Sequence, residues 1–472
     1  MSGLSDVELP AGWARALLGD ICIPVKKVGP EGFDKDRFQY IDIGSVSGPD
    51  RQITAASWIE SSDAPGRARQ IVKEGDTVYS TVRPYLRNIA RVPGTLEGHI
   101  ASTGFAVIRP HREIDSRYIF HAVQGKFFEE QLFPKQRGVS YPAVRDADVF
   151  ETTIPIPPMR EQQRIVEAIE DHLSRLDAAG RELQTAQKKI ASFRKSVLLS
   201  LVPESVPDSW EMSTVGEAGT IGLGRQRHPD WHHGPEMRPY LRVANVFEDR
   251  IDTSDVMEMD FSGVFDRFRL EPGDVLLNEG QSPHLVGRPA LYRGTPPNVA
   301  FTNSLLRFQA RPDVLPEWAL MVFRRHLHAR RFMREVRITT NIAHLSAKRL
   351  KPIEFPVPPL EEQKQRVQAC DELMSYADAM EHALKRNVVR AKHLRSAVLQ
   401  RAFTGRLVPQ DPTDEPASVL LDRIRAKREA QGDKPKRAVR RSRKTATADA
   451  PPPPPASSTP SPNTAVQQEL PL

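Results

Sequence analysis

The chain has 472 residues, of which 39% are hydrophobic, so we expect two or more domains with cores of their own. It has no apolar run of the roughly 18 residues that span a bilayer, and Met1–Asp6 lacks the apolar stretch of a secretory signal, so we expect a cytoplasmic protein without membrane contact. The formal charge is +7, but residues 411–472 hold 11 Lys or Arg against 8 Asp or Glu, and the remaining +4 does not by itself predict nucleic-acid binding.

Residues 1–153 have the pattern of a mixed α/β domain with short strands. An entry segment, Pro10–Trp13, precedes a predicted strand at Tyr40–Gly44. A Gly-Asp turn leads into a second apolar run at Gly75–Ser80, and a helix is predicted at Ser116–Phe128. We call this region domain 1.

A long helix is predicted within residues 154–202. It opens within Ile154–Gln162, whose Pro-Pro pair can precede or open a helix but cannot lie inside one. Glu161 lies in the predicted first turn, where a negative charge interacts favourably with the helix dipole. Apolar residues then recur every seven positions, which is the pattern of a coiled-coil seam. The seam residues are Ile169, Leu176, Leu183, Ile190 and Val197.

The same plan returns in residues 203–354, which we call domain 2, and 355–409. Trp210 repeats Trp13 at an offset of 197, and Phe355–Gln363 repeats Ile154–Gln162 at an offset of 201. Such an internal repeat fixes the architecture before any detail is known. The equivalent strands are Tyr240–Asn245 and Gly273–Asn278, and the helix is at Glu317–Arg331. The second seam is Cys370, Ala377, Leu384, Ala391 and Val398, and its apolar stripe is widened by Val367, Leu373, Met374, Met380, Val388 and Leu394.

Two helices of about 40 residues would each be roughly 60 Å long, and a single apolar stripe of that length needs a partner. Equal length and shared register favour pairing of the two helices with each other, antiparallel if the repeats are related by a pseudo-twofold axis. Pairing with another protein, or dimerisation, is the alternative.

The end of the chain divides in two. Within residues 410–430, Glu415–Arg425 is predicted to form a short amphipathic helix. Residues 431–472 combine a basic run, Lys434–Lys444, with five prolines, Pro451–Pro455, and low hydrophobicity predicts disorder there.

The sequence contains little that predicts covalent chemistry. It has no Walker A loop, and no Asn-Pro-Pro-aromatic or Asp-Pro-Pro-aromatic tetrapeptide of the kind that holds a flipped adenine in amino-methyltransferases. Cys22 and Cys370 have no metal-ligand spacing, and Pro229 and Gly234 break the helix that a zinc pair among His228, His232 and His233 would need. We therefore expect a non-catalytic chain without a bound metal.

Two variable domains, each followed by a long helix that Pro-x-Pro-Pro-x-x-Glu-Gln opens, resemble the specificity subunit of type I restriction-modification enzymes. The resemblance runs from residue 10 to about residue 425 and includes Ala402–Val408 and Glu415–Ser418. One such motif would be a weak signal, whereas the ordered double set is a strong one.

The resemblance implies an α+β fold with two similar target-recognition domains separated by an antiparallel pair of long coiled-coil helices. It also implies that each domain reads one half of an asymmetric, bipartite double-stranded DNA target. The expected partners are two modification subunits, which hold S-adenosylmethionine and methylate adenine at N6. A motor-nuclease restriction subunit, where one exists, would use ATP and Mg²⁺ to cleave unmodified DNA, and no cofactor is expected on this chain.

Base readout needs Arg, Lys, Asn, Gln or Ser on loops that face a groove. Two stretches in each domain mix basic, amide and hydroxyl groups at comparable places in the repeat, although any of these residues could instead be a structural turn residue. The candidates are Thr81, Arg83, Tyr85, Arg87, Asn88, Lys135, Arg137, Ser140 and Tyr141 in domain 1, and Asn278, Gln281, Ser282, His284, Arg288, Arg337, Thr339, Thr340, Asn341 and His344 in domain 2.

Two other functions remain open at this stage. A non-enzymatic coiled-coil scaffold or adaptor that binds proteins accounts for the helices and the modest charge, but it does not explain two divergent domains held at a set distance. A methyltransferase-nuclease fusion would need catalytic motifs that this chain lacks.

Overall fold

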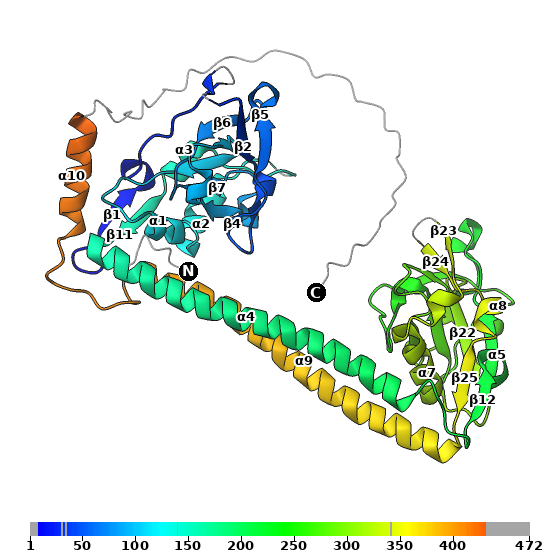
Figure 1. The fold of residues 1–472 in the computed structure, drawn as a ribbon. Coiled ribbons are helices and arrows are strands. Elements are labelled where there is room, and N and C mark those ends of the chain that lie inside the picture. The colour runs from blue at the N-terminus through cyan, green and yellow to red at the C-terminus, as the bar shows by residue number, and fades with distance from the viewer. Residues whose placement is uncertain (1–7, 30–31, 34, 139, 340–341, 431–472) are drawn as a thin grey trace, which may run out of the picture.

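The structure, a computed structural model, places two domains at opposite ends of a pair of long helices (Figure 1). The predicted tail, residues 431–472, lies outside the described part of the chain. The described residues are 8–29, 32–33, 35–138, 140–339 and 342–430.

Domain 1 is built from small sheets with three short helices beside them. Its sheets have the strand orders β5-β2-β9-β6, β10-β7-β8, β3-β4 and β1-β11. The elements are β1 (Ala14–Leu17), β2 (Arg37–Ile41), β3 (Val46–Ser47), β4 (Gln52–Ile53), β5 (Ser57–Glu60), β6 (Ala68–Ile71), β7 (Thr77–Ser80), β8 (Ile89–Arg91), β9 (Ile100–Ser102), β10 (Phe105–Ile108), α1 (Ser116–Ala122), α2 (Lys126–Leu132), α3 (Asp146–Phe150) and β11 (Thr153–Ile156).

Domain 2 repeats this plan with one longer helix. Its sheets have the orders β13-β22-β18-β20, β17-β14-β21, β19-β24-β23, β15-β16 and β12-β25. The elements are β12 (Glu211–Thr214), α5 (Val215–Ala218), β13 (Gly219–Leu223), β14 (Met237–Leu241), β15 (Val246–Phe247), β16 (Arg250–Ile251), β17 (Met257–Asp260), α6 (Phe265–Phe268), β18 (Val275–Asn278), β19 (Gly280–Gln281), β20 (Pro289–Leu291), β21 (Ala300–Phe301), β22 (Leu305–Ala310), α7 (Pro316–His328), β23 (Arg337–Thr339), β24 (Ile342–His344), α8 (Ala347–Leu350) and β25 (Glu354–Val357).

Strand pairing shows that the two domains share one topology. In domain 1, β2 runs antiparallel to β5 and parallel to β9, with Tyr40 opposite Ile100. In domain 2, β14 runs antiparallel to β17 and parallel to β21, with Tyr240 opposite Ala300. The internal repeat in the sequence is therefore a repeat of the fold.

The long helices are α4 (Met159–Leu201) and α9 (Leu360–Phe403), and each starts directly after a Pro-Pro pair. They run antiparallel, because Arg194 near the end of α4 bonds Glu381 in the first half of α9 at 2.8 Å. At 1.5 Å per residue each is about 65 Å long. The helical segments were predicted to start at residues 154 and 355, but residues 154–156 and 355–357 are not helical.

Those residues belong to strands that close each domain. β11 pairs antiparallel with β1, with Ala14 opposite Ile156, and β25 pairs with β12, with Glu211 opposite Val357. The domain boundaries predicted after residues 153 and 354 therefore cut through strands, and each domain includes the strand that leads into its long helix.

All ten predicted seam residues are buried or half-buried between the helices and the domains. Three of the six residues that widen the apolar stripe of α9, namely Val367, Met374 and Met380, are buried or half-buried, and the other three are not. Leu373, Val388 and Leu394 are exposed, because one helical partner covers only one side of α9. The helix pair thus keeps an apolar outer face.

Each domain builds its core on both long helices. Domain 1 packs against Ile165 and Ile169 of α4 and against Phe403 of α9, whereas domain 2 packs against Val197 of α4 and Met374 of α9. The predicted short helix is α10 (Ala417–Ala430), and its residues Leu420, Leu421 and Ile424 enter the core of domain 1.

Candidate nucleic-acid interface

The two candidate stretches of domain 1 lie side by side. Arg137 and Ala143 exchange two backbone hydrogen bonds of 2.9 Å and close a hairpin. The Arg83 amide donates to the Pro142 carbonyl at 2.7 Å, and Val82 forms a β-bridge with Ala143. One continuous surface therefore carries side chains from both stretches.

Three predicted cations of domain 1 form ion pairs on this surface. Each of these pairs has an exposed partner, and ion pairs of this kind contribute little to stability, so the three cations remain candidates for phosphate contact. The pairs are Arg87 with Glu129 at 2.6 Å, Arg137 with Asp148 at 2.9 Å and Lys135 with Glu151 at 3.3 Å.

On this surface the side chains of Tyr85, Arg87, Arg137, Ser140 and Tyr141 are exposed. Arg83 and Asn88 are half-buried. The Arg83 guanidinium carbon lies 4.5 Å from the centre of the Tyr141 ring, which places a cation and an aromatic face together.

A three-stranded sheet joins the two candidate stretches of domain 2. In this sheet β24 lies between β19 and β23, with His344 opposite both Gly280 and Arg337. Thr339 stands opposite Ile342 at the end of the β23–β24 hairpin. Domain 2 thus repeats the hairpin arrangement of domain 1.

The side chains of domain 2 differ in how far they reach outward. His284 is exposed, Gln281 and Ser282 are half-buried, and the Nδ1 of His344 lies 3.3 Å from a carboxylate oxygen of Glu279. The candidates Thr340 and Asn341 lie outside the described residues.

Burial removes three candidates from direct contact with a duplex in this conformation, which corrects the sequence-based prediction. The Thr81 hydroxyl donates to the Gly104 carbonyl at 2.8 Å inside domain 1. Asn278 is fully buried at the end of β18, and Arg288 is buried with its guanidinium over the Phe247 ring at 4.7 Å. All three lie at or next to the end of a buried strand, where sequence position alone did not distinguish them from surface residues.

The repeated helix-opening motif positions the interface. The indole nitrogen of Trp13 donates to Glu161 at 3.0 Å, and that of Trp210 donates to Glu362 at the same distance. These bonds fasten the start of each domain to the first turn of its helix. The recurrence of Trp and Glu at both joints was the sequence signal for this role, which the candidate set missed.

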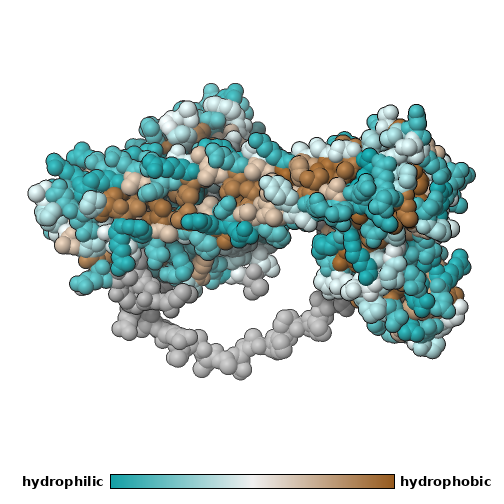
Figure 2. Space-filling model, turned by 90° about the horizontal axis from the view of Figure 1, so that it is seen from below, coloured by the Kyte–Doolittle hydropathy of each residue, from teal (hydrophilic) through white to brown (hydrophobic). Residues whose placement is uncertain are grey.

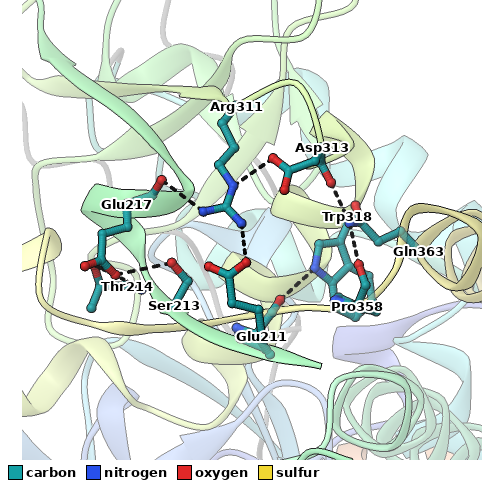
Figure 3. Close-up of polar contacts among 10 residues, drawn as sticks. Glu211, Ser213, Thr214, Glu217, Arg311, Asp313, Trp318, Pro358 and Gln363 are labelled. Carbon is teal, nitrogen blue, oxygen red and sulfur yellow. Dashed lines mark hydrogen bonds and ion pairs between the residues drawn. The ribbon is translucent and has the colours of Figure 1, made fainter. Parts of the chain in front are cut away.

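A buried glutamine completes each joint, and Figure 3 shows the one that belongs to domain 2, Gln363. The Gln363 amide donates to the carbonyls of Pro358 and Asp313, and its oxygen accepts from the Leu315 amide at 2.8 Å. Gln162 accepts from the Asp115 amide at 2.9 Å in the same way. Each glutamine ties the helix start to the loop before the main domain helix.

A second network in Figure 3 braces domain 2 against its entry strand. Arg311 donates to Glu211 and to Asp313 at 2.7 Å each. These hydrogen bonds raise the pKa of the Arg311 guanidinium, so it stays charged at any pH at which the protein is folded.

The described residues contain no cluster of three or more His, Cys, Asp or Glu that could hold a metal ion. Both cysteines are buried; burial raises the pKa of the Cys22 thiol, and it raises the pKa of the Cys370 thiol to about 11. In the same part of the chain, no helix is long and apolar enough to cross a membrane.

Comparison with known protein families gives two matches that follow the repeat. The model of the type I restriction modification DNA specificity domain matches residues 10–190 and again residues 207–390. The chain belongs to this specificity-domain family. The doubled match corresponds to the two domains and their helices.

Individual relatives agree with this membership. The specificity subunit of the type I restriction enzyme EcoKI from Escherichia coli K12 is 25% identical over 70% of this chain and 75% of its own length. The StySPI specificity subunit from Salmonella potsdam is 24% identical over 69% of this chain and 75% of its own length.

Solved structures of the specificity-domain family have the same fold. A chain solved in a study of complex assembly and conformational transition of the type I R-M system is 28% identical, covers 84% of this chain and 99% of its own length, and has a TM-score of 0.72. The HsdS subunit from Thermoanaerobacter tengcongensis is 29% identical, covers 85% of this chain and 99% of its own length, and has a TM-score of 0.55.

This member of the specificity-domain family also has an apolar surface on its long helices. Figure 2 views the molecule from the side of the helices and shows hydrophobic residues along them. Tyr376 is 62% exposed, and Val389 and Leu394 are also exposed on α9. Tyr376, Phe193 and Met380 line a groove of about 480 Å³ between α4 and α9.

Proposed function

We propose that this specificity-domain protein recognises an asymmetric, two-part DNA target, with each domain reading one half. The proposal rests on one observation: the two domains share one topology but present different loop surfaces. Domain 1 presents Tyr85 and Tyr141, whereas the equivalent hairpin of domain 2 presents Ile338 and Ile342. Different surfaces on one scaffold read different sequences, so the two halves of the target should differ.

The helix pair supports a fixed gap between the half-sites. A target of about 13 to 15 base pairs is roughly 45 to 50 Å long at about 3.4 Å per pair. Helices of about 65 Å can hold two domains that far apart. The buried and half-buried seam residues and interhelical ion pairs such as Arg194–Glu381 favour one register of the helices, which supports a fixed distance between the domains.

We also infer that two modification subunits dock on the apolar helix face around Tyr376 and its groove. In this proposal they bind S-adenosylmethionine and methylate adenine N6, while a motor-nuclease subunit uses ATP and Mg²⁺ to cleave unmarked DNA. The exposed apolar side chains of α9 support the docking, because a surface of this kind commonly marks a protein interface. Catalysis would then belong to the partners and recognition to this chain.

The test is to express the chain with its modification subunit in a host without adenine methylation and to map N6-methyladenine across the genome. A single asymmetric motif with a constant gap is the expected result. If the two chains purify as an intact complex and no adenine is marked, the DNA-reading function is wrong and the adaptor function takes its place.

A further inference from the structure

Domain 1 holds a strained turn at the centre of its candidate surface. The 3-10 turn Pro84–Leu86 is flanked by Arg83 and Arg87, with φ of 48° and 54°, both in the left-handed region. Residues other than glycine adopt this conformation infrequently, and such strain persists only where surrounding contacts hold it. Contacts with the rest of domain 1 must therefore hold the turn in this conformation.

The contacts that hold the turn come from both sides. The Arg87 side chain is bonded to Glu129 of α2 at 2.6 Å. Arg83 is fixed by its backbone bond to Pro142 and by its stacking on the ring of Tyr141. The contacts of Arg83 thus join the turn to the neighbouring hairpin, and that of Arg87 joins it to α2.

The turn and the hairpin present large apolar side chains to solvent. Tyr141 is 68% exposed, Tyr85 is 50% exposed and Leu86 is 48% exposed. We call these three residues the aromatic ridge. A ridge of rings with a guanidinium against one of them has the surface that nucleobases stack on, because every base offers a flat π-face.

Domain 2 has no aromatic counterpart on its described hairpin residues. Its β23–β24 hairpin exposes Ile338 and Ile342, branched aliphatic side chains that can touch a thymine methyl group but cannot stack broadly on a base. Tyr141 is thus a difference between the two half-site readers, and a role shared by both domains does not explain it.

We propose that, when a base leaves the helix in the half-site read by domain 1, Tyr141 stacks on the base that is left next to the gap. This inference rests on the proposed function, since it concerns the same surface. A methyltransferase that acts on a base in duplex DNA must take the base out of the helix, and this costs stacking energy. A ring already held in place by Arg83 replaces part of the lost stacking on the neighbouring base.

The test compares three forms of the chain, each in complex with its modification subunit: wild type, Tyr141→Ala and Tyr141→Phe. The probe is a fluorescent duplex that carries the methylated motif, and the readout is the Kd from anisotropy. Because base–aromatic stacking is lost, we expect Tyr141→Ala to weaken binding by about tenfold or more, whereas Tyr141→Phe, which keeps the ring, loses far less. Tyr141 is mostly exposed, so neither substitution should disturb folding.

A second set of duplexes separates stacking from hydrogen bonding. Each carries one mismatched pair, moved through the domain 1 half-site or, as a control, through the domain 2 half-site. A mismatch lowers the cost of unstacking, so one in the domain 1 half-site should restore much of the affinity of Tyr141→Ala. Those in the domain 2 half-site should not.

Three results would overturn the stacking role: wild-type affinity for Tyr141→Ala, an equal loss in Tyr141→Phe, or equal rescue by mismatches in both half-sites. Failure of the proposed function looks different, because wild type would then bind the motif and a scrambled duplex alike. That result would remove the stacking role together with DNA reading.

Discussion

At the scale of single residues, Gln162 and Gln363 close the joints between the domains and the long helices. Each is fully buried and bonds backbone groups on both sides of the joint. Replacing either by methionine keeps the shape but leaves buried backbone groups without partners. We expect Gln162→Met to lower the free energy of unfolding of domain 1 by about 1–3 kcal/mol, and Gln363→Met to do the same in domain 2.

Urea unfolding followed by circular dichroism measures this loss. The matched control is Gln163→Met, since Gln163 is the next residue on α4 and is exposed. If all three variants unfold at the same urea concentration as wild type, the joints do not depend on these amides.

Glu248 gives domain 2 a defined response to acid. Burial raises the pKa of its carboxyl, but the hydrogen bond from His328 and the charge of Arg324 outweigh burial and hold the pKa at about 2, against an ordinary value of 4.5. A lowered pKa stabilises the fold above the ordinary value, and that stability is lost as the pH falls from 4.5 towards 2.

We expect the unfolding free energy of wild type to fall by about 2 kcal/mol more than that of Glu248→Gln between pH 6 and about pH 2. Urea titrations of both proteins across this range would measure the difference. Parallel pH profiles for the two would show that the Glu248 carboxylate does not couple to stability.

At the scale of elements, α10 is a part of domain 1 although it is the last helix of the described sequence. Leu420 is almost fully buried in the domain 1 core, whereas its neighbour Val419 is 42% exposed. Lys427 adds an ion pair with Glu113 of domain 1 at 2.6 Å.

Leu420→Ala should therefore destabilise domain 1 by about 2–5 kcal/mol, because it leaves a cavity in a packed core. Val419→Ala is the matched control and should change stability little. Thermal unfolding would show the contrast, and equal melting temperatures in the two variants would mean that α10 packs loosely.

Elements with a local or repeated signal were predictable from the sequence. The Pro-Pro pairs and the seven-residue seam predicted α4 and α9, and the Gly-Asp turns predicted β7 and β18. Contacts between distant residues were not predictable, since no local pattern encodes them. They include the packing of α10 on domain 1 and the bond between Arg83 and Pro142 that assembles the candidate surface.

At the scale of the whole molecule, the helix pair should set the gap in the DNA target (Figure 1). A seven-residue insertion keeps the seam in register. Placed after Gly180 in α4 and after Lys392 in α9, it lengthens both helices by about 10 Å. We expect the gap in the methylated motif to grow by about 3 base pairs while both half-sites stay the same.

Mapping N6-methyladenine in a strain that carries the double insertion measures this gap. The matched control inserts seven residues in α4 alone, which breaks ion pairs such as Arg194–Glu381 and should abolish methylation. An unchanged gap in the double insertion would rule out the helices as the ruler.

The antiparallel helices also determine when each domain can fold during synthesis. The core of domain 2 uses residues from Val197 to Met374, one continuous stretch. The core of domain 1 starts at Ala16 and is complete only with Ile424, so the first domain made by the ribosome is the last to be finished. A chain that stops before α10 therefore carries a domain 1 whose core lacks Leu420, Leu421 and Ile424.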